Sequence, residues 1–220
     1  MDSTADSSTG RVKQTGQPDS IQSASARAER RIEAIRQAAT RVFLENGYAH
    51  TSVDKIVREA GGSKATIYKY FKNKRELFNA VIDRIVTHRS QTDIDIDDPN
   101  PENALLDFAR RRVDVVFSPE HIALMRLVIA EGPNSPEVAE AYYEHGPAQS
   151  YRTLSRYFRI QNERGKLNID DPDEAAYHFS ALLMHRWYLR KLTGYTKVPS
   201  RKEMERNIQS TVKAFLKLYI

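Results

Sequence analysis

The sequence has 220 residues and contains no cysteine. This absence excludes disulfides, thiolate zinc sites and cysteine nucleophiles, and it fits a reducing compartment such as the cytoplasm. The first ten residues lack the basic-then-apolar pattern of a signal peptide. No apolar run approaches the roughly 18 residues of a membrane span, because polar residues interrupt the most apolar stretch. We therefore expect a cytoplasmic protein without a membrane segment.

Sequence patterns typical of enzymes and metal sites are also missing. The six histidines show no HExxH or comparable spacing, and there is no glycine-rich phosphate loop and no GxSxG sequence. Residues 93–98 begin like a calcium-binding loop, but Asp98 stands where that loop needs glycine and Ala104 where it needs glutamate. We expect no enzyme activity, no metal and no cofactor, and interpret the acidic segment as a solvated loop.

Strand signals are nearly absent, whereas helix signals are dense. A capping residue followed by proline marks four helix starts: Asn100-Pro101, Ser118-Pro119, Ser135-Pro136 and Asp171-Pro172. A capping box at Ser200 and Glu203 indicates a fifth start, and four more helices are expected between residues 26 and 90. The sequence thus predicts an all-α protein of about nine helices. Residues 1–25 are polar and are interpreted as a disordered tail.

Positive charge is concentrated in one short segment. The whole chain has a net charge of +5, and residues 27–78 alone carry 12 Lys and Arg against 6 Asp and Glu, a net of +6. Such a distribution is expected of a small nucleic-acid-binding module attached to an uncharged body. A solvated basic surface explains the charge equally well, so charge alone does not decide between the two interpretations.

The segment GGSKATIYKYFKNKRELF, which begins at Gly61, adds a specific pattern. A helix with an apolar face ends at Gly61 and Gly62, Ser63 can cap a short following helix, and Ile67 and Phe71 share the inner face of that helix. Its outer face carries lysines, tyrosines and a threonine. This arrangement is typical of a helix-turn-helix, whose second helix enters the major groove of DNA. The alternative is an ordinary helical hairpin, but two tyrosines on an otherwise wet face favour DNA binding.

The residue types on this face suggest individual roles. Lys64 can reach guanine O6 or N7, and Ala65 is small enough to approach a thymine methyl group. Hydroxyls and the remaining lysines suit phosphate oxygens. The predicted DNA-contacting residues are Thr51, Ser52, Ser63, Lys64, Ala65, Thr66, Tyr68, Lys69, Tyr70 and Lys74.

Residues 51–78, together with residues 31–48, resemble the DNA-binding module of the TetR/AcrR family of transcriptional repressors. Gly62 replaces the family's usual aliphatic residue, and Tyr70 replaces a frequent histidine. The resemblance implies that Lys64, Ala65 and Tyr68 lie nearest the bases, with the other contacts holding the backbone. Residues 124–149 are similar to the AefR-like branch of the family's C-terminal domains. We therefore expect a DNA-binding domain at 26–74 and a ligand-binding and dimerisation domain at 75–220.

The last two helices suggest a homodimer. The segment 172–193 is apolar on more than one face, and the final helix repeats the pattern, so each can cover its own domain and a partner. In the family these helices form a four-helix bundle between two copies. The predicted interface residues are Phe179, Leu183, Ile208, Val212, Phe215 and Tyr219.

The resemblance also implies an effector site. Family members bind a small, often apolar ligand in this body and then release double-stranded operator DNA. Candidate lining residues, each of which is also a reasonable core residue, are Phe117, His121, Met125, Tyr142, His178 and Trp187. The expected function is a repressor of a palindromic operator, with activation left open. A sequence-indifferent architectural protein is disfavoured, because its charge would be spread along the chain.

Overall fold

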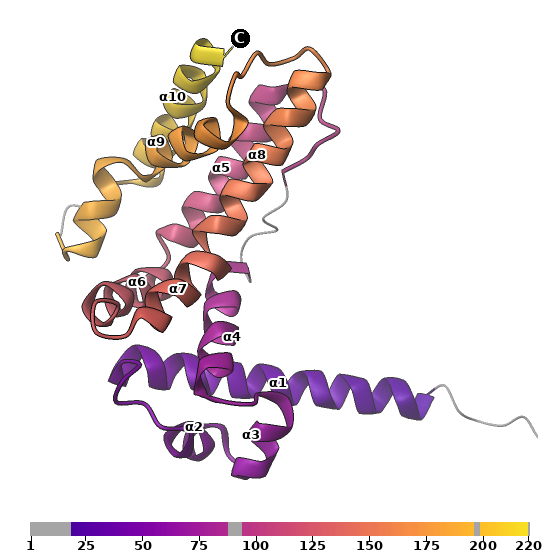
Figure 1. Ribbon diagram of the computed structural model, residues 1–220, viewed down its shortest axis with the longest axis vertical. Coiled ribbons are helices and arrows are strands. Elements are labelled where there is room, and N and C mark those ends of the chain that lie inside the picture. The colour runs from indigo at the N-terminus through magenta and orange to yellow at the C-terminus, as the bar shows by residue number, and fades with distance from the viewer. Residues whose placement is uncertain (1–18, 88–93, 196–198, 220) are drawn as a thin grey trace, which may run out of the picture.

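The computed structural model describes residues 19–87, 94–195 and 199–219, which form only α-helices and connecting loops (Figure 1). The prediction of an all-α fold is confirmed. The ten helices in this part of the chain are α1 (Asp19–Asn46), α2 (Val53–Ala60), α3 (Lys64–Tyr70), α4 (Lys74–Thr87), α5 (Pro101–Val116), α6 (Pro119–Glu131), α7 (Pro136–His145), α8 (Pro147–Glu163), α9 (Pro172–Leu192) and α10 (Arg201–Tyr219). None of them is long and apolar enough to cross a membrane.

The number of helices exceeds the expected nine because the segment 136–163 is two helices. Gly146 ends α7, with its N–H donating to the Tyr142 carbonyl, and Pro147 begins α8. Proline lacks the backbone N–H that a continuous helix needs at this point, and its ring clashes with the preceding turn. A second difference concerns the N-terminus: α1 begins at Asp19, so residues 19–25 of the expected tail are helical. Residues 1–18 lie outside the described part.

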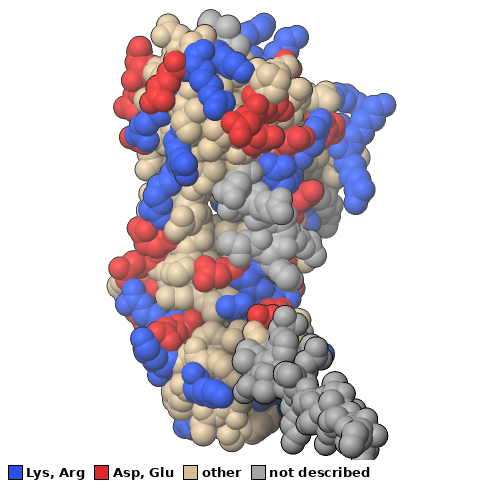
Figure 2. All heavy atoms as spheres, turned by 90° about the vertical axis from the view of Figure 1, so that its right-hand side faces the viewer, with Lys and Arg blue, Asp and Glu red and all other residues tan. Residues whose placement is uncertain are grey.

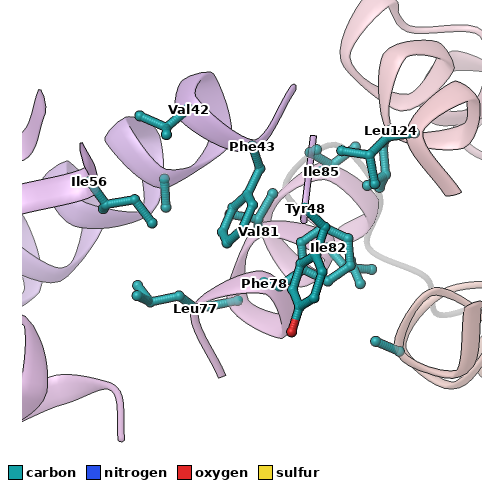
Figure 3. Packing of buried hydrophobic residues seen from close by; sticks show 14 of the residues in the cluster. Val42, Phe43, Tyr48, Ile56, Leu77, Phe78, Val81, Ile82, Ile85 and Leu124 are labelled. Atoms are coloured by element: carbon teal, nitrogen blue, oxygen red, sulfur yellow. The ribbon is translucent and has the colours of Figure 1, made fainter. Parts of the chain in front are cut away.

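One hydrophobic core fills the end of the molecule that contains α1 to α4. Phe43 and Tyr48 pack against Phe78, with ring centroids 4.9–5.8 Å apart. Ile56 of α2 and Ile67 of α3 are fully buried in the same cluster. Figure 3 shows α4 side chains at the centre of this packing, with Leu124 of α6 approaching from the other side. The helix-turn-helix therefore packs on α1 and α4 through this shared core.

A second core lies between α5, α8, α9 and α10 at the opposite end (Figure 1). Phe158, Phe179 and Phe215 meet there with centroid distances of 5.0–5.2 Å. The first core does not stop at α4, because it also includes residues of α6 and α7, among them Leu127 and Val138. As a result, α6 and α7 connect the two ends of the molecule.

Candidate DNA-binding surface and cavity

The turn between α2 and α3 is fixed by two serine caps and by one arginine. The Ser52 and Ser63 side chains accept hydrogen bonds from backbone N–H groups in the first turns of α2 and α3. Gly61 and Gly62 have φ angles of 66° and 97°, a region that favours glycine. The Arg31 guanidinium donates to the carbonyls of Ala60 and Gly61 and so satisfies the end of α2. Sequence reasoning assigned no role to Arg31.

The outer face of α3 is open to solvent. Lys64, Ala65, Tyr68 and Lys69 are exposed, and Tyr68 is 44% exposed although it is a large aromatic residue. Ile67, on the inner face, is fully buried. In Figure 1 this helix lies at the lower end of the molecule, and the lowest part of the face in Figure 2 carries Lys and Arg side chains. The helix can therefore approach a large anionic partner.

Lys64 is paired within the chain. Its ammonium group lies 3.1 Å from a carboxylate oxygen of Asp54 on α2, and both side chains are more than half exposed. The hydrogen bond to Asp54 raises the pKa of Lys64, so the ammonium stays charged at neutral pH. An exposed pair of this kind is weak and exchanges readily for another acceptor.

Three other predicted DNA-contacting residues fall into two groups. Ser63 and Thr66 are hydrogen-bonded to each other through their hydroxyls, 2.9 Å apart, at the start of α3. Thr51 is only 3% exposed, and its hydroxyl donates to the Gly47 carbonyl at 2.6 Å. Thr51 thus holds the loop before α2, whereas the serine and threonine hydroxyls of α3 stay near the surface.

Tyr70 and Lys74 are partly buried beside the first core. Tyr70 packs against that core, with the Lys69 ammonium 5.5 Å from its ring centre. The Lys74 ammonium lies 4.3 Å from the centre of the Tyr48 ring, and burial lowers the pKa of this lysine. Both side chains are anchored at the edge of the candidate surface.

Glu131, at the end of α6, joins the C-terminal part of the chain to the loop before α2. Its carboxylate accepts hydrogen bonds from the backbone N–H groups of Tyr48 at 2.8 Å and Ala49 at 2.7 Å. A Cβ atom at Gly47 would overlap this carboxylate. The last residue of α6 is therefore hydrogen-bonded directly to the loop that leads into the helix-turn-helix.

A cavity of about 350 Å³ lies where α5 to α9 meet. Its walls are aromatic, aliphatic and thioether side chains with a few polar groups: Arg112, Met125, Tyr142, Pro147, Ser150, Tyr151, Tyr177, Ser180, Ala181, Leu183, Met184 and Tyr188. Among the predicted pocket residues, Met125 and Tyr142 lie in this wall. His121 does not line the cavity but contacts a residue that does, since its Nε2 lies 3.2 Å from the Tyr142 hydroxyl. The Phe117 ring is 6.0 Å from that of Tyr188.

The structure places the two remaining predicted pocket residues elsewhere. His178 is exposed and contacts the Tyr219 hydroxyl at 3.1 Å and the Glu174 carboxylate at 3.3 Å. Trp187 lines a separate polar depression between α9 and α10, together with Arg206. Neither residue is part of the cavity wall described above.

The predicted interface residues mostly face inward. Phe179, Val212 and Phe215 are fully buried within one protomer, and Leu183 and Ile208 are 2–3% exposed. Tyr219 is half-buried against Phe215. The structure thus differs from the expectation, because the inner faces of α9 and α10 build the second core. Other apolar residues of these helices are exposed: Leu182, Leu189 and Leu218.

Arg112 is the charged residue of the cavity wall, and the sequence analysis did not predict it. It lies on the buried stripe of α5 between Phe108 and Val116, and it is only 7% exposed. The signal was present in the sequence: three consecutive arginines, Arg110 to Arg112, cannot all face solvent on a helix whose apolar residues recur every three or four positions.

Comparison with known proteins identifies two matching family profiles. Residues 35–81 match the tetR family of bacterial regulatory proteins, and residues 103–220 match the C-terminal domain of AefR-like transcriptional repressors. The transcriptional repressor SCO4008 of Streptomyces coelicolor is 30% identical over 141 residues, which cover 63% of this chain and 69% of the relative. The regulator YhgD of Bacillus subtilis is 38% identical over 61 residues, 28% of this chain, and the chain spans only about a third (32%) of its length.

Solved structures agree with these matches. A TetR-family regulator from Mesorhizobium loti has a TM-score of 0.71 and 30% identity, with coverage of 88% of this chain and 98% of its own. The flavonoid-responsive regulator FrrA has a TM-score of 0.73 and 30% identity, with coverage of 87% and 97%. Because the AefR-like profile alone spans more than half of the chain, the protein belongs to the TetR family of DNA-binding transcriptional regulators.

Proposed function

We propose that the protein is a homodimeric repressor that binds a palindromic operator through α3 and leaves it when a small molecule fills the cavity. The observation that carries this proposal is the outer face of α3, where Lys64, Ala65 and Tyr68 are exposed on a helix fixed from behind by Ile67. The major groove admits one such helix. The AefR-like repressor profile supports repression over activation.

We propose a specific role for each residue of this surface. Lys64 is proposed to exchange Asp54 for a guanine, with Ala65 and Tyr68 beside it in the groove. Ser52, Ser63, Thr66 and the lysines Lys69 and Lys74 are proposed to bind phosphates, as is Tyr70. Thr51 is assigned a supporting role, because its hydroxyl is already bonded to the Gly47 carbonyl.

The proposed dimer uses the outer faces of α9 and α10. Leu182, Leu189 and Leu218 are exposed by 37%, 65% and 70%, which is unusual for leucine and typical of a surface covered by a second copy. A two-fold pairing would present two α3 helices to half-sites about 34–36 Å apart, one turn of DNA. The operator is therefore expected to be a palindrome.

The proposed release mechanism runs through α6. Met125 lines the cavity and Glu131, six residues further along the same helix, binds the loop before α2. At 1.5 Å per residue the two positions are about 9 Å apart along a rigid element. A ligand that displaces α6 would move this loop and change the separation of the two α3 helices. The name of the relative FrrA, a flavonoid-responsive regulator, supports a small-molecule effector.

Selection of bound DNA from a random pool tests this function. The expected result is a palindromic sequence with half-site centres one helical turn apart, bound with one dimer per site. Lys64→Ala should relax the preference at one base pair of each half-site, and Lys217→Ala, a change at an exposed lysine of α10, serves as the control. Recovery of sequences without symmetry or preference would contradict the proposal.

A further inference from the structure

Arg112 presents a buried and partly unsatisfied guanidinium to the cavity. The residue is almost fully buried, and it forms part of the cavity wall. Its Nη1 atom is buried without a hydrogen-bond partner in the described part of the chain, and so is the hydroxyl of Ser150, which lines the same cavity. Two unsatisfied polar groups at one wall indicate a place where a polar ligand group fits.

No acid in the described residues forms an ion pair with Arg112. The groups that act on it electrostatically are the hydroxyls of Tyr142, Tyr151 and Tyr188, and burial raises the pKa of all three, so that they are uncharged at neutral pH. Burial also lowers the pKa of Arg112, but a guanidinium keeps its proton in proteins. The positive charge is therefore not balanced by the described part of this protomer.

Arg110, on the same helix, is paired with carboxylates, as arginines usually are. It is more exposed, and its guanidinium lies 2.7 Å from Glu205 and 3.1 Å from Asp107. A buried charge without such a partner is strongly unfavourable. Arginine is the residue best suited to hold a carboxylate, because its N–H groups match the two carboxylate oxygens.

The other residues of the cavity wall determine which apolar group of a ligand fits beside Arg112. Met125, Leu183 and Met184 provide apolar and polarisable surface, and tyrosine rings flank them. Aromatic ligands pack well against such rings and against thioethers. The volume of about 350 Å³ lies at the lower end of the range for small-molecule sites. A compact aromatic molecule fits this space better than a long chain.

We propose that the cavity binds a small aromatic carboxylate, whose carboxylate pairs with Arg112 and accepts a hydrogen bond from Ser150 while its ring lies among the tyrosines and methionines. This identifies the chemical class of the effector and in that respect rests on the proposed function. Binding of the anion and release of DNA are nevertheless separate measurements.

Calorimetric titration with three probes of similar shape tests the inference: cinnamate, the neutral cinnamamide and the cationic cinnamylamine. The wild-type protein should bind cinnamate at least about tenfold more tightly than cinnamamide and should not bind cinnamylamine. Arg112→Met should bind cinnamate and cinnamamide equally. Arg110→Met, on the same helix but paired with surface acids, should keep the wild-type preference.

A conservative variant and an aliphatic probe separate the contributions of the charge and of the ring. Arg112→Lys keeps the charge and should retain part of the preference for cinnamate. Binding of cinnamamide by Arg112→Met shows that the loss of preference in that variant is not a folding defect. Octanoate should bind more weakly than cinnamate if the wall selects aromatic rings. Equal binding of cinnamate and cinnamamide by the wild type, or a preference that survives Arg112→Met, would overturn the inference. Arg112-dependent binding that leaves operator DNA bound would preserve it and contradict the proposed release.

Discussion

Replacing Glu131 by glutamine tests the connection between α6 and the helix-turn-helix. The carboxylate accepts two backbone N–H groups, from Tyr48 at 2.8 Å and Ala49 at 2.7 Å. Glutamine offers one oxygen, so one of the two bonds is lost and the other loses its charge. Hydrogen bonds to a charged group contribute about 1.5–3 kcal/mol, and the lower end applies because water reaches Ala49.

A loss of about 1.5 kcal/mol corresponds to a decrease in Tm of roughly 3–6 °C for a chain of this size. Thermal unfolding followed by circular dichroism, at one fixed protein concentration, measures it. Glu140→Gln is the matched control, because Glu140 forms an exposed ion pair with Arg75 that is worth at most about 1 kcal/mol. A Tm for Glu131→Gln within one degree of the wild type would show that water satisfies the loop equally well, and would refute the proposed connection.

Three other changes test the DNA surface, the dimer and the cavity. Lys64→Ala should weaken binding roughly 10- to 100-fold at one base pair in competition assays, whereas a uniform loss would assign Lys64 to a phosphate. Leu218→Glu should yield folded monomers in sedimentation experiments, while Phe215→Ala should cost about 3–5 kcal/mol of stability; a dimeric Leu218→Glu protein would place the interface elsewhere. Burial and the Arg112 guanidinium lower the pKa of His121 to about 4, below its unfolded value near 6.5. Stability should therefore fall by up to about 3 kcal/mol as pH drops from 6.5 to 4, and His121→Gln should remove that dependence in urea titrations.

Most helix boundaries could be predicted because they depend on neighbouring residues. Helices α5, α6, α7 and α9 begin at the prolines that follow the predicted caps. The expected capping box also forms, since the Ser200 N–H donates to the Glu203 carboxylate at 2.8 Å while the Ser200 hydroxyl accepts from the Glu203 N–H at 3.3 Å. Caps of this kind act within one turn of the chain and so are visible in the sequence.

The faces of α9 and α10 could not be assigned in the same way. Each helix carries apolar residues on two sides, and periodicity does not tell which side packs within the protomer. Phe215 and Leu218 illustrate the point, since they are three residues apart and yet one is fully buried and the other 70% exposed. Arg112 was missed for a related reason. Its lack of an acidic partner among the described residues is visible only when α5 to α9 are packed together around the cavity.

The continuity of the first core across α4, α6 and α7 bears on how this protein can be recombined with others. In a hybrid regulator that exchanges only residues up to 74, the foreign DNA-binding domain would pack against Leu124, Leu127 and Val138. These side chains pack in the first core with the original DNA-binding domain. Transferring the DNA-binding domain together with α4, α6 and α7 would keep those contacts intact. The practical unit of exchange is thus set by shared packing and not by the end of the sequence motif.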